Sequence, residues 1–237
     1  MRSPLEFGPW VHRAEVDSTQ AEAQRLLANR DPVGIVLAAN QTAGRGRFTR
    51  EWVSAPGRSL TMSLVFGNYA DHPKPWLIGM AVAVAVAGAT RAQLRWPNDL
   101  SLRGKKLGGI LTEVVEDPDR RRVAIVGVGI NLRPVELPAE LARSVTDLES
   151  ERGAAPTAED LARTILEHLE RLPEPDSWAA LAPVWGLFDA TPGKKYRDGQ
   201  GRVLVAIGIG SDAELIASHE GETETVLAAD ALFGVER

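Results

Sequence analysis

The feature that most constrains this chain is an apolar run near its middle, residues 76–89, which carries no charged side chain. The run is 14 residues long, whereas a helix that crosses a membrane needs roughly 18 or more apolar residues. Ala, Val and Gly dominate it, so neighbouring elements can pack closely against it. We therefore expect a buried helix over 78–89, although the Ala/Val alternation leaves a strand as the alternative.

Short β-like segments lie around this run. Strands are expected at 14–17, 34–39, 59–65, 94–96, 106–115 and 123–128. Residues 59–65 alternate in polarity, which predicts one buried face. Helices are expected at 19–28, capped by the hydroxyl of Ser18 or Thr19, from Thr157 onward, and at 178–187. Because strands follow one another with few helices between them, we predict an α+β fold with an antiparallel or mixed sheet.

The character of the sequence changes after Pro192. Three β-like pieces, 202–207, 213–217 and 224–228, are separated by glycine-containing turns. Turns at such short intervals over so few residues are typical of a small β-barrel. We predict a catalytic domain at 1–189 and a barrel domain at 190–237.

Cysteine is absent, and 27 Lys+Arg against 32 Asp+Glu give a net charge of −5. The lack of thiols excludes disulfides, cysteine-ligated metals and thiolate nucleophiles. A weakly acidic surface argues against general binding to nucleic acid or to an anionic membrane. Residues 1–13 contain no apolar core typical of a secretory signal, so we expect a cytoplasmic protein.

One segment reverses the acidic balance. Residues 43–58 carry four arginines and one glutamate, a local charge of +3. Glycines alternate with arginines in Gly44-Arg45-Gly46-Arg47 without hydrophobic periodicity, which predicts a mobile loop rather than a helix or strand. The pattern is not a P-loop. Taken alone, it fits a solvated surface loop as well as a local anion site.

Four motifs then occur in a fixed order. They are Asp17-Ser18-Thr19, the stretch from Gln41 to Arg47, Trp96-Pro97-Asn98-Asp99 with Lys106-Leu107-Gly108-Gly109-Ile110-Leu111, and Gly127-Val128-Gly129-Ile130-Asn131. Together they resemble the biotin–protein ligase family over essentially the whole chain. The resemblance implies a catalytic domain related to class II aminoacyl-tRNA synthetases and lipoate ligases, followed by an SH3-like barrel.

The resemblance also implies a two-step reaction and its partners. Biotin and ATP, with Mg²⁺, would give biotinyl-5′-AMP and pyrophosphate. A lysine of a biotin carboxyl carrier domain, such as that of acetyl-CoA carboxylase, would then accept the biotin. Only 17 residues precede Ser18, too few for the helix-turn-helix domain of repressor-type members, so we expect no nucleic-acid binding and leave monomer and homodimer open.

By the same resemblance, the expected catalytic residues are Lys106, Arg47 and Arg45. The expected biotin-binding residues are Ser18, Thr19, Gln41, Gly44, Arg45, Lys106, Gly108 and Gly109. The expected nucleotide-binding residues are Arg47, Trp52, Asn98, Asp99, Gly127, Gly129 and Asn131, with Asp99 also as a magnesium ligand through the phosphates. Cations suit this chemistry because a carboxylate must approach a second anion, the α-phosphate.

Plain structural explanations stay open for several of these residues. Ser18 serves equally well as a helix cap, Asn98 and Asp99 as turn residues, Trp52 as packing and Lys106 as an exposed strand lysine.

The sequence departs from the family pattern at a few positions. Gln20 stands where Asn is usual, Arg95 replaces the Lys before Trp-Pro-Asn-Asp, and Phe48-Thr49 occupy positions where Arg and Gly are common. The end of the barrel reads Ala228-Ala229-Asp230 instead of Gly-Glu-Val. These differences concern loop closure, phosphate contacts and barrel placement rather than the reaction class.

Two other functions remain open. A lipoate–protein ligase would use the same adenylation but would need a long apolar slot without polar partners for a ureido ring, and Ser18, Thr19 and Gln41 favour biotin. A non-catalytic biotin or adenylate sensor would not need both Arg47 and Lys106. Octanoyl-transferring relatives require a cysteine nucleophile, which is absent.

Overall fold

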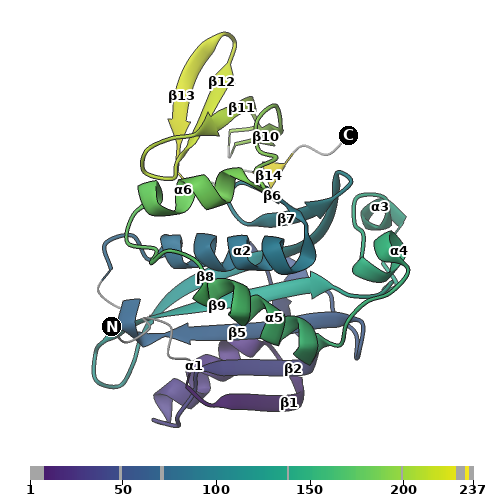
Figure 1. Ribbon diagram of the computed structural model, residues 1–237, viewed down its shortest axis with the longest axis vertical. Coiled ribbons are helices and arrows are strands. Elements are labelled where there is room, and N and C mark those ends of the chain that lie inside the picture. The colour runs from purple at the N-terminus through teal and green to yellow at the C-terminus, as the bar shows by residue number, and fades with distance from the viewer. Residues whose placement is uncertain are drawn as a thin grey trace.

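A computed structural model describes residues 8–47, 50–69, 72–137, 139–198, 200–227 and 233–234. A seven-stranded sheet forms its centre, with helices on both faces and a smaller sheet at one end (Figure 1). The features noted at Phe48-Thr49 and Ala228-Ala229-Asp230 lie outside the described residues. Among the described residues, no helix is both long enough and apolar enough to cross a membrane.

The large sheet has the strand order β1-β2-β5-β9-β8-β7-β6. Its strands are β1 (Trp10–Val16), β2 (Ile35–Gln41), β5 (Ser59–Phe66), β6 (Gln93–Arg95), β7 (Asp99–Leu102), β8 (Lys105–Glu116) and β9 (Arg122–Asn131). Only β1 and β2 pair in parallel, and the other neighbours are antiparallel. The prediction of an α+β fold with a mixed sheet is confirmed, and β7 is a strand that the sequence did not indicate.

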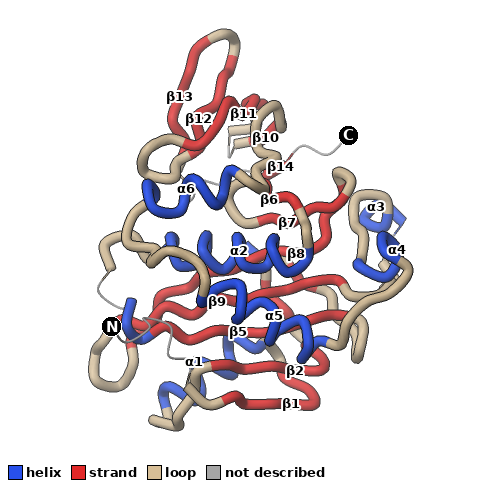
Figure 2. The backbone as a smooth tube through the Cα atoms, viewed as in Figure 1, coloured by secondary structure: helices blue, strands red, loops and turns tan. Residues whose placement is uncertain are grey.

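The apolar run forms the central helix α2 (Trp76–Thr90), with every residue from Leu77 to Ala87 buried. A Cβ at Gly79 would lie 2.0 Å from Oγ1 of Thr112 on β8, so the missing side chain lets the helix lie directly on the sheet. Helices α5 (Ala158–Glu170) and α6 (Trp178–Gly186) pack against α2 from outside (Figure 2). The expectation of a buried helix is confirmed.

The opposite face of the sheet is covered by α1 (Thr19–Ala28). Ile35 and Leu37 belong to the main core, whereas Val36 packs with Ala23 of α1, as strand alternation requires. Strand β5 is therefore buried on both faces, and the expected single buried face is wrong. Ser18 is the N-cap of α1 but makes no capping side-chain hydrogen bond, so the expected hydroxyl cap is also wrong.

The glycine–arginine segment is not a plain loop. It forms a short hairpin from β3 (Gly44–Arg45) and β4 (Glu51–Trp52), which pair through their backbones. The two strands show no hydrophobic alternation, so the sequence pattern did not reveal them. A 3-10 turn at Gly67–Tyr69 and two short helices, α3 (Ala139–Ala142) and α4 (Leu148–Arg152), were not expected either. They are too short for a hydrophobic period to mark them.

The C-terminal part is a five-stranded antiparallel sheet with the order β13-β12-β11-β10-β14. Its strands are β10 (Lys195–Arg197), β11 (Val203–Ile209), β12 (Leu215–His219), β13 (Glu222–Val226) and β14 (Phe233–Gly234). Leu204, Ala206 and Leu215 share one hydrophobic core with α2 and the large sheet. The division at residues 189 and 190, and the SH3-like form of this sheet, stay predictions.

Candidate functional site

A cavity of about 810 Å³ lies between the large sheet, the start of α1, the β3–β4 hairpin and five further residues, Val135, Leu137, Leu141, Ser144 and Val145. Most of the predicted site residues line it: Ser18, Thr19, Gln41, Arg45, Arg47, Trp52, Asn98, Asp99, Lys106, Gly109, Gly127, Gly129 and Asn131. Four motifs spread over more than a hundred residues of sequence thus meet at one hollow.

Two predicted biotin-binding residues, Gly44 and Gly108, do not line the cavity. A Cβ at Gly108 would lie 2.3 Å from the carbonyl oxygen of Gly129 on the neighbouring strand. A Cβ at Gly44 would lie 2.4 Å from the carbonyl oxygen of Trp52 across the hairpin. Both glycines permit close backbone pairing beside the cavity, and neither presents a surface to it.

One end of the cavity is polar but uncharged. The side-chain oxygen Oε1 of Gln41 accepts hydrogen bonds from the Thr19 backbone N–H at 2.8 Å and from Oγ1 of Thr19 at 3.1 Å. Oγ of Ser63 in turn donates to Oγ1 of Thr19 at 2.8 Å. Ser18 and Thr19 are each only 3% exposed. We call Ser18, Thr19 and Gln41 the neutral end, which Ser63 supports from outside the cavity lining.

The other end carries the charges. Nζ of Lys106 lies 2.6 Å from Oδ1 of Asp99, and a guanidinium nitrogen of Arg47 lies 3.5 Å from Oδ1 of Asn98. Asn98 is itself fixed, since its amide nitrogen donates to the Ile110 carbonyl at 2.6 Å. We call Arg47, Asn98, Asp99 and Lys106 the charged end.

Burial lowers the pKa of Arg47, with Arg50 acting in the same direction and Asp99 opposing it. Arginine nevertheless stays protonated in proteins. A partly desolvated, permanent cation therefore faces the cavity, where its interaction with an anion is stronger than it would be in bulk water.

Trp52 forms a flat wall on this side of the cavity. A Cβ at Gly129 would lie 2.7–3.0 Å from ring atoms of Trp52, so the indole rests on the backbone of β9. Its Nε1 is buried and has no hydrogen-bond partner among the described residues. Nearby, the Asn131 amide nitrogen donates to the Thr146 carbonyl at 3.0 Å, which ties β9 to the segment that precedes α4.

Two contributors were not predicted from sequence. Tyr196 of β10 lines the cavity and donates from its hydroxyl to the Trp96 carbonyl at 2.8 Å, and burial raises its pKa well above the usual range. Glu113 of β8 pairs with Arg45 at 2.8 Å. The indole N–H of a buried tryptophan such as Trp96 needs a hydrogen-bond partner. In the structure, Nε1 of Trp96 donates to the Ala213 carbonyl at 2.8 Å. The sequence predicts the need for a partner but not the segment that supplies it.

A metal ion at this site would need ligands from the substrate as well as from the protein. Among the described residues, no group of three or more His, Asp or Glu side chains could hold a metal ion. Magnesium commonly binds through one or two carboxylates together with substrate phosphates. Asp99, with one carboxylate at the charged end, fits that pattern.

Comparison with known proteins agrees with this geometry. Residues 11–131 match the biotin/lipoate A/B protein ligase family. The bifunctional ligase/repressor BirA of Bacillus subtilis is 38% identical over 152 residues, which make up 60% of this chain and 47% of that protein. The biotin–[acetyl-CoA-carboxylase] ligase of Mycobacterium tuberculosis is 32% identical over 236 residues, which make up 92% of this chain and 86% of that protein.

A solved structure extends the similarity to the whole fold. The biotin protein ligase from Aquifex aeolicus, in complex with biotin and ATP, has a TM-score of 0.75 at 25% identity and covers 95% of this chain and 99% of that chain. The present chain spans about half the length of the Bacillus relative and most of the length of the mycobacterial one. Because the family model matches residues 11–131 and the mycobacterial relative aligns over nearly its full length, the chain belongs to the biotin/lipoate A/B protein ligase family.

Proposed function

We propose that the protein is an ATP-dependent biotin–protein ligase. The observation that carries the proposal is the division of one cavity into a neutral hydrogen-bonding end and a charged end. A ureido ring is neutral and needs hydrogen-bond partners, which Ser18, Thr19 and Gln41 offer. A carboxylate and a triphosphate are anions and need cations, which Arg47 and Lys106 offer.

In the first step, a biotin carboxylate oxygen attacks the α-phosphorus of ATP. The bond from the α-phosphorus to the bridging oxygen breaks, pyrophosphate leaves, and a mixed anhydride, biotinyl-5′-AMP, remains. Lys106 and Arg47 lower the repulsion between the two anions and stabilise the charge that develops on the phosphoryl oxygens. Trp52 offers its flat face to adenine. Magnesium bound by the phosphates and Asp99 would neutralise further charge.

In the second step, the neutral amine of a carrier lysine attacks the acyl carbon of the anhydride. The bond from that carbon to the AMP oxygen breaks, AMP leaves, the amine loses a proton and an amide forms. The β3–β4 hairpin with Arg47 lies at the cavity and would keep water from the anhydride until the lysine arrives.

The acceptor we propose is the biotin carboxyl carrier domain of acetyl-CoA carboxylase or of another biotin-dependent carboxylase. The mycobacterial relative is named for that acceptor. We place the reaction in the cytoplasm, and we assign the catalytic work to residues 1–189, with 190–237 as a supporting SH3-like domain.

The test is transfer to a carrier. Purified protein, MgATP and biotin are mixed with an unmodified carrier domain and with the same domain whose target lysine is replaced by arginine. We expect biotin on the first domain at that single lysine and none on the second. Failure to label the first domain, with biotin and ATP both bound, would refute the ligase and favour the sensor.

A further inference from the structure

One carboxylate beside the cavity collects hydrogen bonds without lining the cavity itself. Oε2 of Glu113 accepts from the Gln20 amide at 2.9 Å, from the Gln24 amide at 3.4 Å and from the Arg45 guanidinium at 2.8 Å. Three donors on one oxygen make Glu113 the joint between helix α1 and the β3–β4 hairpin. No step of the proposed reaction uses this carboxylate.

Gln20 connects that joint to the neutral end. Its Oε1 lies 3.4 Å from Oγ of Ser63, and Ser63 donates to Oγ1 of Thr19 at 2.8 Å. Gln20 is 3% exposed, and its side chain lies against Gly127, where a Cβ would approach it to 3.2 Å. A continuous line of polar contacts therefore runs from Thr19 through Ser63 and Gln20 to Glu113.

Arg45 connects the joint to the hairpin. It pairs in register with Glu51 across the two strands, and the Gly46 N–H donates to the Arg50 carbonyl at 2.7 Å. Arg47 follows two residues later and faces the cavity. Fixing the Arg45 side chain to the sheet therefore fixes the stem of the hairpin that carries Arg47.

We propose that Glu113 is a positioning residue, which holds the β3–β4 hairpin over the cavity and, through Gln20, connects the hairpin to the neutral end. The inference rests on the proposed ligase function for its consequence, retention of the acyl-adenylate. The ion pair is partly exposed, with side-chain exposures of 42% for Arg45 and 27% for Glu113, so its effect falls on hairpin closure more than on overall stability.

The main variant is Glu113→Gln, which keeps the size and an acceptor oxygen but removes the charge that holds Arg45. The matched control is Glu116→Gln on the same strand, whose carboxylate is 54% exposed and pairs only with Arg120, at 3.4 Å, among the ion pairs of the described residues. The readout is the number of pyrophosphates released per biotin transferred to a carrier domain. We expect this ratio to rise about fivefold in Glu113→Gln and to stay at the wild-type value in Glu116→Gln.

A double-variant comparison shows whether Glu113 acts through Arg45. If it does, Glu113→Gln should add nothing to Arg45→Gln, because interacting residues are non-additive. Arg45→Lys, which keeps the positive charge, should retain most of the coupling. Additive effects, or a Glu113→Gln ratio equal to that of Glu116→Gln, would overturn the proposal.

A second readout does not depend on activity. Trypsin cleaves after arginine, so we expect faster cleavage within residues 43–58 in Glu113→Gln than in Glu116→Gln, with the thermal midpoint checked in both. Equal cleavage rates would refute the positioning role. The two proposals can fail separately. If Glu113→Gln is cleaved faster but the wild-type protein releases no pyrophosphate with biotin, the proposed function is refuted and the positioning role stands. If Glu113→Gln fails to fold, Arg45→Gln carries both readouts.

Discussion

The two ends of the cavity are held in different ways. At the neutral end, buried Thr19 hydrogen-bonds both the half-buried Gln41 and the buried Ser63, so this geometry exists before a ligand arrives. At the charged end, Lys106 and Asp99 remain 32% and 37% exposed and pair with each other. In the proposed reaction, the neutral end would therefore bind its ligand with preformed hydrogen-bond geometry, whereas the charged end would exchange protein partners for substrate anions.

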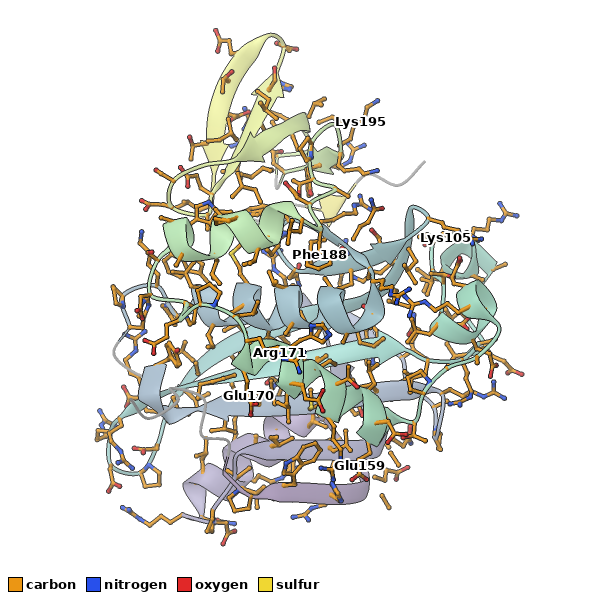
Figure 3. All side chains as sticks on the ribbon, viewed as in Figure 1. Lys105, Glu159, Glu170, Arg171, Phe188 and Lys195 are labelled. Atoms are coloured by element: carbon orange, nitrogen blue, oxygen red, sulfur yellow. The ribbon has the colours of Figure 1, made fainter. Side chains whose placement is uncertain are left out.

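The largest effect is expected at the charged end. Lys106→Ala should lower biotin-dependent pyrophosphate release by about 100-fold or more, because removing one preorganised charge at a reacting centre has an effect of this order. Lys105→Ala is the matched control, since Lys105 is the exposed first residue of β8, directly after the β7–β8 turn (Figure 3). Equal rates for the two variants would remove Lys106 from the mechanism.

The Trp52 wall on the charged side of the cavity gives the next effect. Gly129→Ala places a methyl group within 3.0 Å of the Trp52 ring and must displace it. We expect the KM for ATP to rise about tenfold, equivalent to about 1.4 kcal/mol, with biotin affinity unchanged. Gly186→Ala, where nothing lies within 4 Å of the added Cβ, is the control. A matching rise in biotin Kd would mean that the wall serves both substrates.

At the neutral end we expect a smaller effect, on biotin binding and not on the KM for ATP. Thr19→Val keeps the shape but removes the hydroxyl that joins Gln41 to Ser63, which costs about 1 kcal/mol. Biotin binding measured by calorimetry should weaken about fivefold, and the KM for ATP should not change. Thr19→Ser restores the hydroxyl and should restore most of the affinity. A change confined to ATP would reverse the assignment of the two ends.

The smallest effect concerns support of the neutral end. Arg25 lowers the pKa of Asp17 from 3.8 to about 2. The ionised form thus stabilises the fold fully above pH 3.8, and this contribution is lost as the pH falls toward 2. Because the pair is about half exposed, Asp17→Asn should lower the unfolding free energy at pH 7 by under about 1 kcal/mol. Denaturant titrations of both proteins should converge as the pH falls to about 2; a constant difference would contradict the ion-pair account.

Sequence patterns predicted the elements whose signal is local. The apolar run over 76–89 forms α2, and the predicted site residues line one cavity, apart from Gly44 and Gly108. What escaped depends on distant contacts. The second buried face of β5 requires α1, Tyr196 meets Trp96 from 100 residues away, and Glu113 becomes a joint only when Gln20 and Arg45 are brought to it. No period or propensity along the chain carries that information.

The most direct test of the account is pyrophosphate release from MgATP with biotin, with lipoate or with no added acid. We predict that pyrophosphate is released with biotin but not with lipoate or without an acid. The Lys106→Ala variant should lose this biotin-dependent release, and the Lys105→Ala variant should keep it. Release with lipoate and not with biotin would contradict the reading of the neutral end. Silence with both acids, in a protein that binds biotin, would contradict the ligase assignment itself.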